Sequence, residues 1–144
     1  MFNMFFSVVS IVCLVFFAGN VHFTETLSIN EEPRVKSIRL VGGLTPWEGR
    51  VEILHGGEWG TVCDDLWDLA DAHIVCLSMG YAYSVAALSG APFGEGTGDI
   101  LLDAVECYGN ESSILDCLHD GVGIHDCKHD EDAGVRCSIS AGIN

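Results

Sequence analysis

Two groups of carboxylates are the side chains of this sequence most able to bind a ligand. One group follows a predicted strand and consists of Asp64, Asp65, Asp68 and Asp71. The other surrounds a cysteine and consists of Asp126, Asp130, Glu131 and Asp132. Carboxylates packed together are costly unless they share a hard cation, and Ca²⁺ takes several carboxylate oxygens. The spacing is not that of a calcium-binding loop, so a shared cation requires a fold that brings the two groups together.

Some of these acids have a simpler interpretation. Short acidic side chains accept backbone N–H bonds at helix starts and in turns. We expect Asp68, Asp71 and Asp132 to have this capping role.

No pattern for enzyme catalysis accompanies the acids. Ser78 lacks the Gly-x-Ser-x-Gly turn of a nucleophile. His119, His125 and His129 crowd around Cys127 as zinc ligands can, but no Cys-x-x-Cys pair accompanies them. We therefore expect no enzyme and no zinc site, and interpret the histidines as surface or hydrogen-bonded loop residues.

The cysteines indicate an oxidising compartment. One of the seven, Cys13, lies in an apolar N-terminal segment. The others form an even set and are Cys63, Cys76, Cys107, Cys117, Cys127 and Cys137. In a secreted chain such a set predicts three disulfides, although six cysteines allow 15 pairings and spacing alone does not choose among them.

The N-terminal segment has the pattern of a signal peptide over residues 1–19, since the first charged residue is Glu25. No Lys or Arg precedes the apolar run, and its length is at the short edge of a membrane span, so an uncleaved anchor is the alternative. After it we expect a flexible lead-in at 20–36, one folded domain at 37–138 and a short tail at 139–144. Either interpretation places the domain outside the cell, as a secreted or membrane-anchored protein.

The charge balance excludes two classes of partner. The net charge is −15, with 21 acidic and only six basic residues. Binding of nucleic acid through a basic surface is excluded on this ground, and so is direct docking on anionic lipid. An anionic ligand would need a cation between itself and this surface.

The elements that must position these residues predict a small α+β domain with limited core. Alternating β-formers predict strands at 38–41, 50–54, 58–62, 100–105 and 134–137, with a hairpin turn at 55–57. A helix should begin at a cap at Asp68 or Asp71 and end before Gly80. Its apolar stripe consists of Leu69, Ala72, Val75, Cys76 and Met79. One or two helical turns at 111–117 and long loops at 81–98 and 118–133 complete the expected chain.

A series of ordered motifs resembles one known family. The motifs include RLVGG at 39–43, EGRVEI at 48–53, GEWGTVCDDLWD at 57–68, CYGNESS at 107–113 and EDAGVRC at 131–137. Over roughly residues 38–137 the chain closely resembles the scavenger receptor cysteine-rich (SRCR) domain, in its six-cysteine, group A-like form. This resemblance implies a small disulfide-rich fold in which a curved antiparallel sheet cradles one main helix.

The resemblance also implies the disulfide pairing Cys63–Cys127, Cys76–Cys137 and Cys107–Cys117. Where the eight-cysteine form of the family has its extra pair, this chain has Trp47 and Tyr81. The chain departs from the family at Leu101, where a Trp is usual, and at 121–124, where a Trp-Gly is usual. Both departures weaken any expectation of an aromatic ligand surface in those loops.

Two cation sites occur in some members of the family, and the resemblance maps both onto acids of this chain. The first site corresponds to Asp64, Asp65 and Glu131, and the second to Asp65, Asp103 and Asp126. A Cys63–Cys127 bridge would bring the two acidic groups together. We therefore expect a non-catalytic Ca²⁺ or Mg²⁺ site.

The function implied is cation-dependent recognition of anionic or glycan ligands, including glycoproteins, of the scavenger or innate-defence kind. A structural or adhesive protein–protein module is the alternative, and an accessory domain of a longer extracellular enzyme is a weaker one. Asn110-Glu111-Ser112 is an N-glycosylation sequon, so we also predict a glycan at Asn110.

Overall fold

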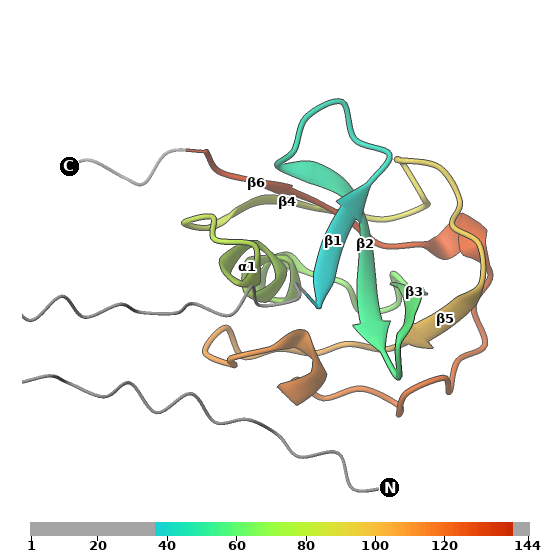
Figure 1. Ribbon diagram of the computed structural model, residues 1–144. Helices are drawn as coiled ribbons and strands as arrows, with labels where there is room; N and C mark the ends of the chain where they lie inside the picture. The colour runs from blue at the N-terminus through green and yellow to red at the C-terminus, as the bar shows by residue number, and fades with distance from the viewer. Residues whose placement is uncertain (1–36, 140–144) are drawn as a thin grey trace, which may run out of the picture. The chain divides into compact units, whose positions relative to one another are not determined.

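One helix and a curled sheet make up the domain in the computed structural model, which describes residues 37–139 (Figure 1). The strands are β1 (Ile38–Val41), β2 (Glu48–His55), β3 (Glu58–Val62), β4 (Ser84–Leu88), β5 (Asp99–Leu102) and β6 (Gly134–Cys137). The helix is α1 (Leu69–Ser78), and two 3₁₀ turns are η1 (Ile114–Asp116) and η2 (His129–Glu131). The predicted leader at 1–19, the lead-in at 20–36 and the end of the tail lie outside the described residues.

Strand β2 is the centre of the sheet because three strands pair with it. The strand order is β4-β6-β2-β3-β5, and β1 pairs with β2 outside this path. Strand β1 takes one edge of β2, while β6 and then β3 share the other edge, at Glu48–Arg50 and Glu52–His55 respectively. Strands β6 and β3 therefore occupy successive parts of that edge, and the sheet that they form with β2 is curled (Figure 1).

The sheet is antiparallel except at one pair. Strand β5 runs parallel to β3, with Thr61 opposite Ile100 and a shift in register before Val62. A long connection, rather than a tight hairpin turn, leads into β5 and permits this direction. The other four pairs of strands are antiparallel, so the expected curved antiparallel sheet is confirmed with this one parallel pair added.

Strand β4 and turn η2 lie inside segments that were expected to be loops. The sequence of β4, Ser-Val-Ala-Ala-Leu, has neither the alternation nor the β-branched content that predicts a strand. It becomes a strand by pairing with β6, with Ala87 opposite Val135. Tertiary pairing therefore overrides local propensity here.

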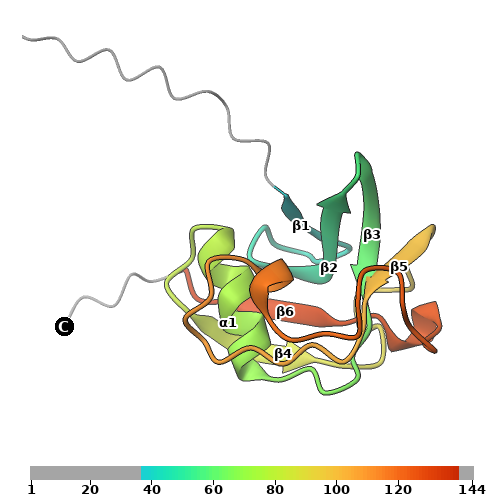
Figure 2. The ribbon, with the colours of Figure 1, turned by 90° about the horizontal axis from the view of Figure 1, so that it is seen from below.

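Helix α1 begins and ends as its caps predict. Asp68 is the N-cap and forms a capping box with Asp71, and Gly80 follows the C-cap with φ of 90°. The predicted apolar stripe is partly wrong, because Leu69 is 56% exposed while Asp71 and Ile74 are buried. The buried face is set by α1 lying against β4 and β6, as Figure 2 shows.

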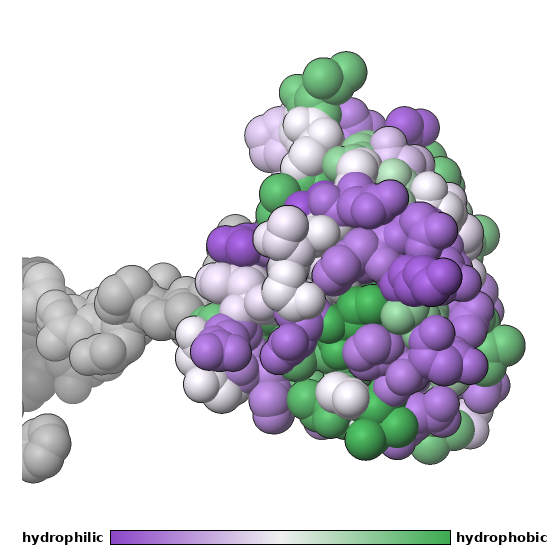
Figure 3. Space-filling model, turned by 90° about the vertical axis from the view of Figure 1, so that its right-hand side faces the viewer, coloured by the Kyte–Doolittle hydropathy of each residue, from purple (hydrophilic) through white to green (hydrophobic). Residues whose placement is uncertain are grey.

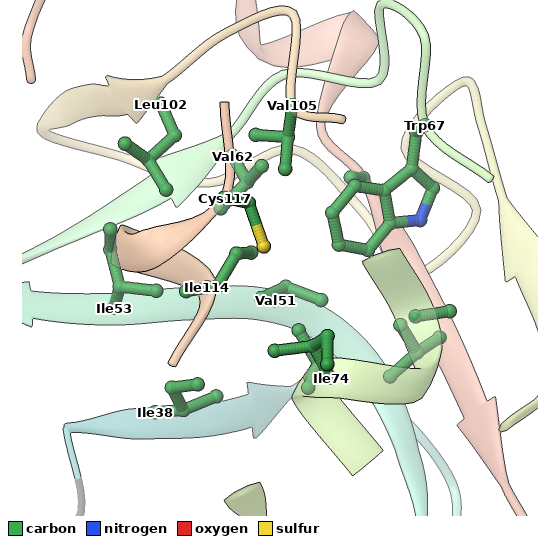
Figure 4. Packing of buried hydrophobic residues seen from close by; sticks show 14 of the residues in the cluster. Ile38, Val51, Ile53, Val62, Trp67, Ile74, Leu102, Val105, Ile114 and Cys117 are labelled. Carbon is green, nitrogen blue, oxygen red and sulfur yellow. The ribbon is translucent and has the colours of Figure 1, made fainter. Parts of the chain in front are cut away.

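The core lies between the sheet and the helix (Figure 4). Val51 of β2 lies beside Ile74 of α1, and Ile53 of β2 and Ile114 of η1 belong to the same cluster. Each such buried side chain contributes about 1.5–3 kcal/mol relative to an exposed one. Trp67 joins the core and donates its indole N–H to the Gly134 carbonyl at 3.1 Å.

Three disulfides supplement this small core, and their pairing confirms the expectation. Cys63–Cys127, Cys76–Cys137 and Cys107–Cys117 are bonded. Trp47 and Tyr81 both pack against the core, and the Tyr81 hydroxyl donates to the Pro46 carbonyl at 2.9 Å. Aromatic packing and one hydrogen bond thus join the segment of Trp47 to that of Tyr81.

Among the helices of residues 37–139, none has the length and apolar character needed to cross a membrane.

Candidate functional site

The parallel pair of strands positions the two central acids of the candidate site. Asp65 follows β3 and Asp103 follows β5, and parallel strands end at the same edge of a sheet. The Cys63 amide donates to the Leu102 carbonyl at 2.8 Å, which fixes the two strand ends together. One carboxylate oxygen of Asp65 and one of Asp103 lie within 4.8 Å of each other.

The Cys63–Cys127 disulfide brings the second acidic group to the same place. Its Cα atoms are 6.2 Å apart, and its sulfurs lie within the same 4.8 Å cluster as the two acids. The backbone amide of Asp126 donates to Asp103 Oδ2 at 3.4 Å, so Asp126 stands beside this centre. Because both sulfurs are oxidised to a disulfide, the possible ligands here are carboxylate oxygens.

Asp103 is buried and hydrogen-bonded. The residue is only 3% exposed, and its Oδ1 accepts the Ala104 amide at 2.6 Å. A buried carboxylate is costly without compensation by hydrogen bonds or a positive charge. In residues 37–139 no Lys or Arg side chain lies within 4 Å of Asp103, Asp65 or Asp126.

The pKa of Asp65 is affected by all four of the other predicted ligands. Partial desolvation raises the pKa of the Asp65 carboxyl, and negative charge nearby raises it further. The neighbours that supply this charge are Asp103, Glu131, Asp126 and Asp64. Hydrophilic side chains cover most of the face that carries β5 and η2 (Figure 3). Such a centre is suited to a hard cation, which replaces mutual repulsion by attraction.

Asp64 and Glu131 are adjacent through their backbones, since the Asp64 amide donates to the Glu131 carbonyl at 2.8 Å. Their side chains already accept hydrogen bonds. Asp64 Oδ2 accepts the Gly90 amide, and Glu131 Oε2 accepts the Lys128 amide at 2.8 Å. Each carboxylate still has a second oxygen for a cation. The assignment of these two acids and of Asp65, Asp103 and Asp126 as ligands stays a prediction.

Backbone strain occurs next to both central acids. Leu66 and Ala104 have φ of 62° and 50°, and they directly follow Asp65 and Asp103. A residue with a Cβ atom pays about 1–2 kcal/mol for a left-handed conformation. Sequence reasoning had no signal for this feature, because glycine normally marks such positions.

Asp68 and Asp71 have structural roles. Asp68 Oδ1 accepts the Ala70 amide at 2.7 Å, and Asp71 accepts the Asp68 and Cys107 amides at 2.7 Å each. Burial raises the pKa of Asp71 to about 6. Capping is therefore confirmed for Asp68 and Asp71.

Asp132 was also expected to be a capping residue. Its side chain instead connects loops that are distant from each other in the sequence. Its Oδ2 accepts the Gly96 amide at 2.6 Å, and both of its oxygens lie 3.1 Å from His129 Nδ1. A Cβ atom on Gly96 would come within 3.0 Å of this carboxylate and closer still to Thr61. The loop before β5 thus approaches Asp132 only because residue 96 is a glycine.

The histidines behave as loop residues. His119 Nδ1 accepts the Gly121 amide at 2.9 Å, His129 contacts Asp132, and His125 is exposed. Cys127 is in a disulfide, so it offers no thiolate to zinc. Asn110 is exposed, and the neighbouring Glu111 accepts three backbone amides, which lowers its pKa.

Comparison with known proteins agrees with this architecture. The family model "Scavenger receptor cysteine-rich domain" matches residues 41–138. A "Scavenger receptor cysteine-rich domain superfamily protein" of Patiria pectinifera is 56% identical over 101 residues, 70% of this chain and 9% of that protein. The galectin-3-binding protein of Rattus norvegicus is 55% identical over 108 residues, 74% of this chain and 19% of that protein. The chain thus spans less than a fifth of the length of these curated relatives.

Solved structures of SRCR domains have the same fold as this chain. The third SRCR domain of murine neurotrypsin superposes with a TM-score of 0.65 at 48% identity, covering 69% of this chain and 94% of that one. The SRCR domain of mouse MARCO, solved in a dimeric form, gives a TM-score of 0.60 at 45% identity, covering 74% of this chain and 100% of that one. Sequence, disulfide pairing and fold together show that the chain belongs to the scavenger receptor cysteine-rich domain family.

Proposed function

We propose that this chain is an extracellular recognition module that binds anionic or glycan ligands through a bridging Ca²⁺ or Mg²⁺ ion. The SRCR domain is an extracellular module for protein interaction. The proposal adds to this the class of ligand and the bridging cation. The observation that carries the proposal is the approach of Asp65 and Asp103 to within 4.8 Å without a nearby Lys or Arg among the described residues. The ion would be non-catalytic.

Five carboxylates would hold the ion or ions. Asp65 and Asp103 are the central ligands, Asp126 would complete one site, and Asp64 with Glu131 would complete a second one with Asp65. A bound divalent ion keeps coordination positions for water or for ligand oxygens. A sulfate, carboxylate or hydroxyl group of a ligand can replace that water, which gives an acidic surface a means of binding an anion.

The relatives support the general class of activity. The name of the rat relative states that it binds galectin-3, and mouse MARCO carries the same domain. Recognition of glycoproteins or polyanions by this chain is accordingly part of the proposal. So are its location outside the cell and the glycan at Asn110, which mass spectrometry of the secreted product would detect together with the mature N-terminus.

Calorimetry with Ca²⁺ tests the ion. The whole disulfide-bonded protein should release or take up heat that saturates, and Asp65→Asn should abolish it. Asp99→Asn is the matched control, because Asp99 is an exposed acid at the opposite end of β5. Absence of a Ca²⁺-dependent heat in the unchanged protein would contradict the proposal.

Binding to immobilised dextran sulfate tests the ligand class. We expect binding in Ca²⁺ that is lost in EDTA and in the Asp65→Asn variant, and kept in Asp99→Asn. Binding that survives both EDTA and Asp65→Asn would favour the structural or adhesive alternative.

A further inference from the structure

A separate cavity lies beside the start of α1. Its volume is about 280 Å³, and it is lined by Leu66, Asp68, Glu106, Cys107 and Tyr108. None of the five carboxylates of the candidate cation site lines it. The cavity is formed where the chain between β3 and α1 meets the chain that follows β5.

Two large apolar side chains line the cavity beside its carboxylates, and both are exposed. Leu66 is 62% exposed and Tyr108 is 82% exposed, which are high values for a large aliphatic and an aromatic side chain. Scattered exposed apolar side chains are normal, but two that line one cavity indicate a surface that a partner can cover.

Two carboxylates give the cavity its charge. Asp68 Oδ1 accepts the Ala70 amide at 2.7 Å and the Asp71 amide at 3.3 Å, and the Asp68 carboxylate is also in hydrogen-bond contact with the Asp71 side chain. Glu106 is fixed through its backbone, which exchanges hydrogen bonds with Leu118 at 2.9 and 3.1 Å. Within residues 37–139 the Glu106 side chain takes part in no hydrogen bond or ion pair. The cavity therefore carries two carboxylates, and among the described residues neither forms an ion pair with a Lys or Arg.

We propose that this cavity receives an arginine side chain presented by a protein partner. The guanidinium group is planar and binds carboxylates with two parallel hydrogen bonds, and it also stacks on aromatic rings. Asp68 and Glu106 supply the carboxylates, Tyr108 supplies the ring, and Leu66 contacts the aliphatic stem. The opposing effect is the partial positive charge at the N-terminus of α1, which Asp68 Oδ1 and Asp71 already offset.

This inference does not depend on the cation site. Arginine binding at the cavity needs no metal, so it persists in EDTA, whereas recognition through Ca²⁺ does not. A partner that carries both an arginine and an acidic or sulfated group could use both sites.

Titration with a short peptide tests the cavity. The probe is acetyl-Gly-Arg-Gly-amide, added in EDTA to the ¹⁵N-labelled, disulfide-bonded full chain, and acetyl-Gly-Gln-Gly-amide is the uncharged control peptide. We expect saturable shifts of the amide resonances of Leu66, Asp68 and residues 106–108 with the arginine peptide only. Glu106→Gln and Tyr108→Ala should each weaken binding roughly threefold or more, the size of an exposed charge contact.

Glu58→Gln is the matched control, since Glu58 is an exposed acid in the β2–β3 hairpin, outside the cavity. It should leave the affinity unchanged. The spectrum of each variant without peptide reports whether the fold is intact. Equal shifts with the glutamine peptide, or equal losses in Glu58→Gln and Glu106→Gln, would overturn the proposal in favour of diffuse attraction to an acidic surface.

Discussion

Asp65 and Asp103 approach each other because the strands before them run parallel and end at the same edge of the sheet. They are far apart in sequence, and neither has a Lys or Arg within 4 Å in the described part of the chain. Two carboxylates in such a position repel each other until a proton or a cation intervenes.

Asp65→Asn should have opposite effects with and without Ca²⁺. In EDTA the change removes one charge from the cluster, so the melting temperature should rise. In Ca²⁺ the unchanged protein should be stabilised by binding, and the variant should not. Differential scanning calorimetry measures both, with Asp99→Asn as the control. If the melting temperature of the unchanged protein were the same with and without Ca²⁺, this expectation would be contradicted.

Disulfide removal should separate stability from cation binding. Replacing Cys107 and Cys117 by serine should cost about 3 kcal/mol of unfolding free energy, because the bridge closes a short loop. Replacing Cys63 and Cys127 should cost about 4 kcal/mol and should also abolish Ca²⁺ binding, since this bridge joins the acidic groups. Denaturant unfolding and calorimetry would show the difference. Equal retention of Ca²⁺ binding in the two variants would refute the role assigned to Cys63–Cys127.

Because Asp71 is buried, the free energy of unfolding should depend on acidic pH in an unusual way. Burial raises its pKa in the folded state to about 6, above the ordinary value of 3.8. The folded protein therefore binds a proton that the unfolded chain does not, and stability from this group should increase as the pH falls from about 7 through 6 towards 4. Urea unfolding between pH 7 and pH 4.5 measures this slope, and Asp71→Asn should flatten it. A slope of the opposite sign that persists in Asp71→Asn would contradict the assignment.

The ion pairs of Glu52 should make the fold less stable at acidic pH. Burial raises its pKa, but ion pairs with Arg50 at 2.8 Å and with Arg39 lower it by more, so the net shift is below 4.5. Stability from this group is present above pH 4.5 and should be lost as the pH falls below that value. Glu52→Gln should remove this acid loss while reducing stability at pH 7. The control is Glu58→Gln, an exposed acid whose removal should leave the acid limb unchanged.

The same substitution at two alanines should change stability in opposite directions. Ala104→Gly should stabilise the fold by about 0.5–1 kcal/mol, because φ of 50° strains a residue with a Cβ atom. Ala87→Gly in β4 should destabilise by a similar amount, because glycine is unfavourable within a strand. Denaturant unfolding of both variants tests the strain next to Asp103, and a loss of stability in both would argue against it.

Local signals in the sequence were sufficient for most elements, and contacts between distant segments explain the rest. Strong β-formers and two capping acids predicted β1, β3, β6 and α1 closely. Strand β4 was missed because only its partner β6 makes it a strand. The exposure of Leu69 was missed because the sheet decides which face of α1 is buried. For the site, the resemblance supplied the acids, but the parallel direction of β5 that places Asp103 beside Asp65 had no sequence signal.

The first and last strands of the domain, β1 and β6, both pair with β2. This pairing determines how the domain responds to a pulling force on its two ends. Strand β1 pairs at Ile53 near one end of β2, and β6 pairs at Glu48 at the other end. A pull on the two chain ends therefore loads both ladders of hydrogen bonds in shear, along β2, so that many bonds must break together. If the ladders fail, the Cys76–Cys137 bridge still prevents extension of the chain between those residues. The arrangement should make the domain resist extension between its first and last strands.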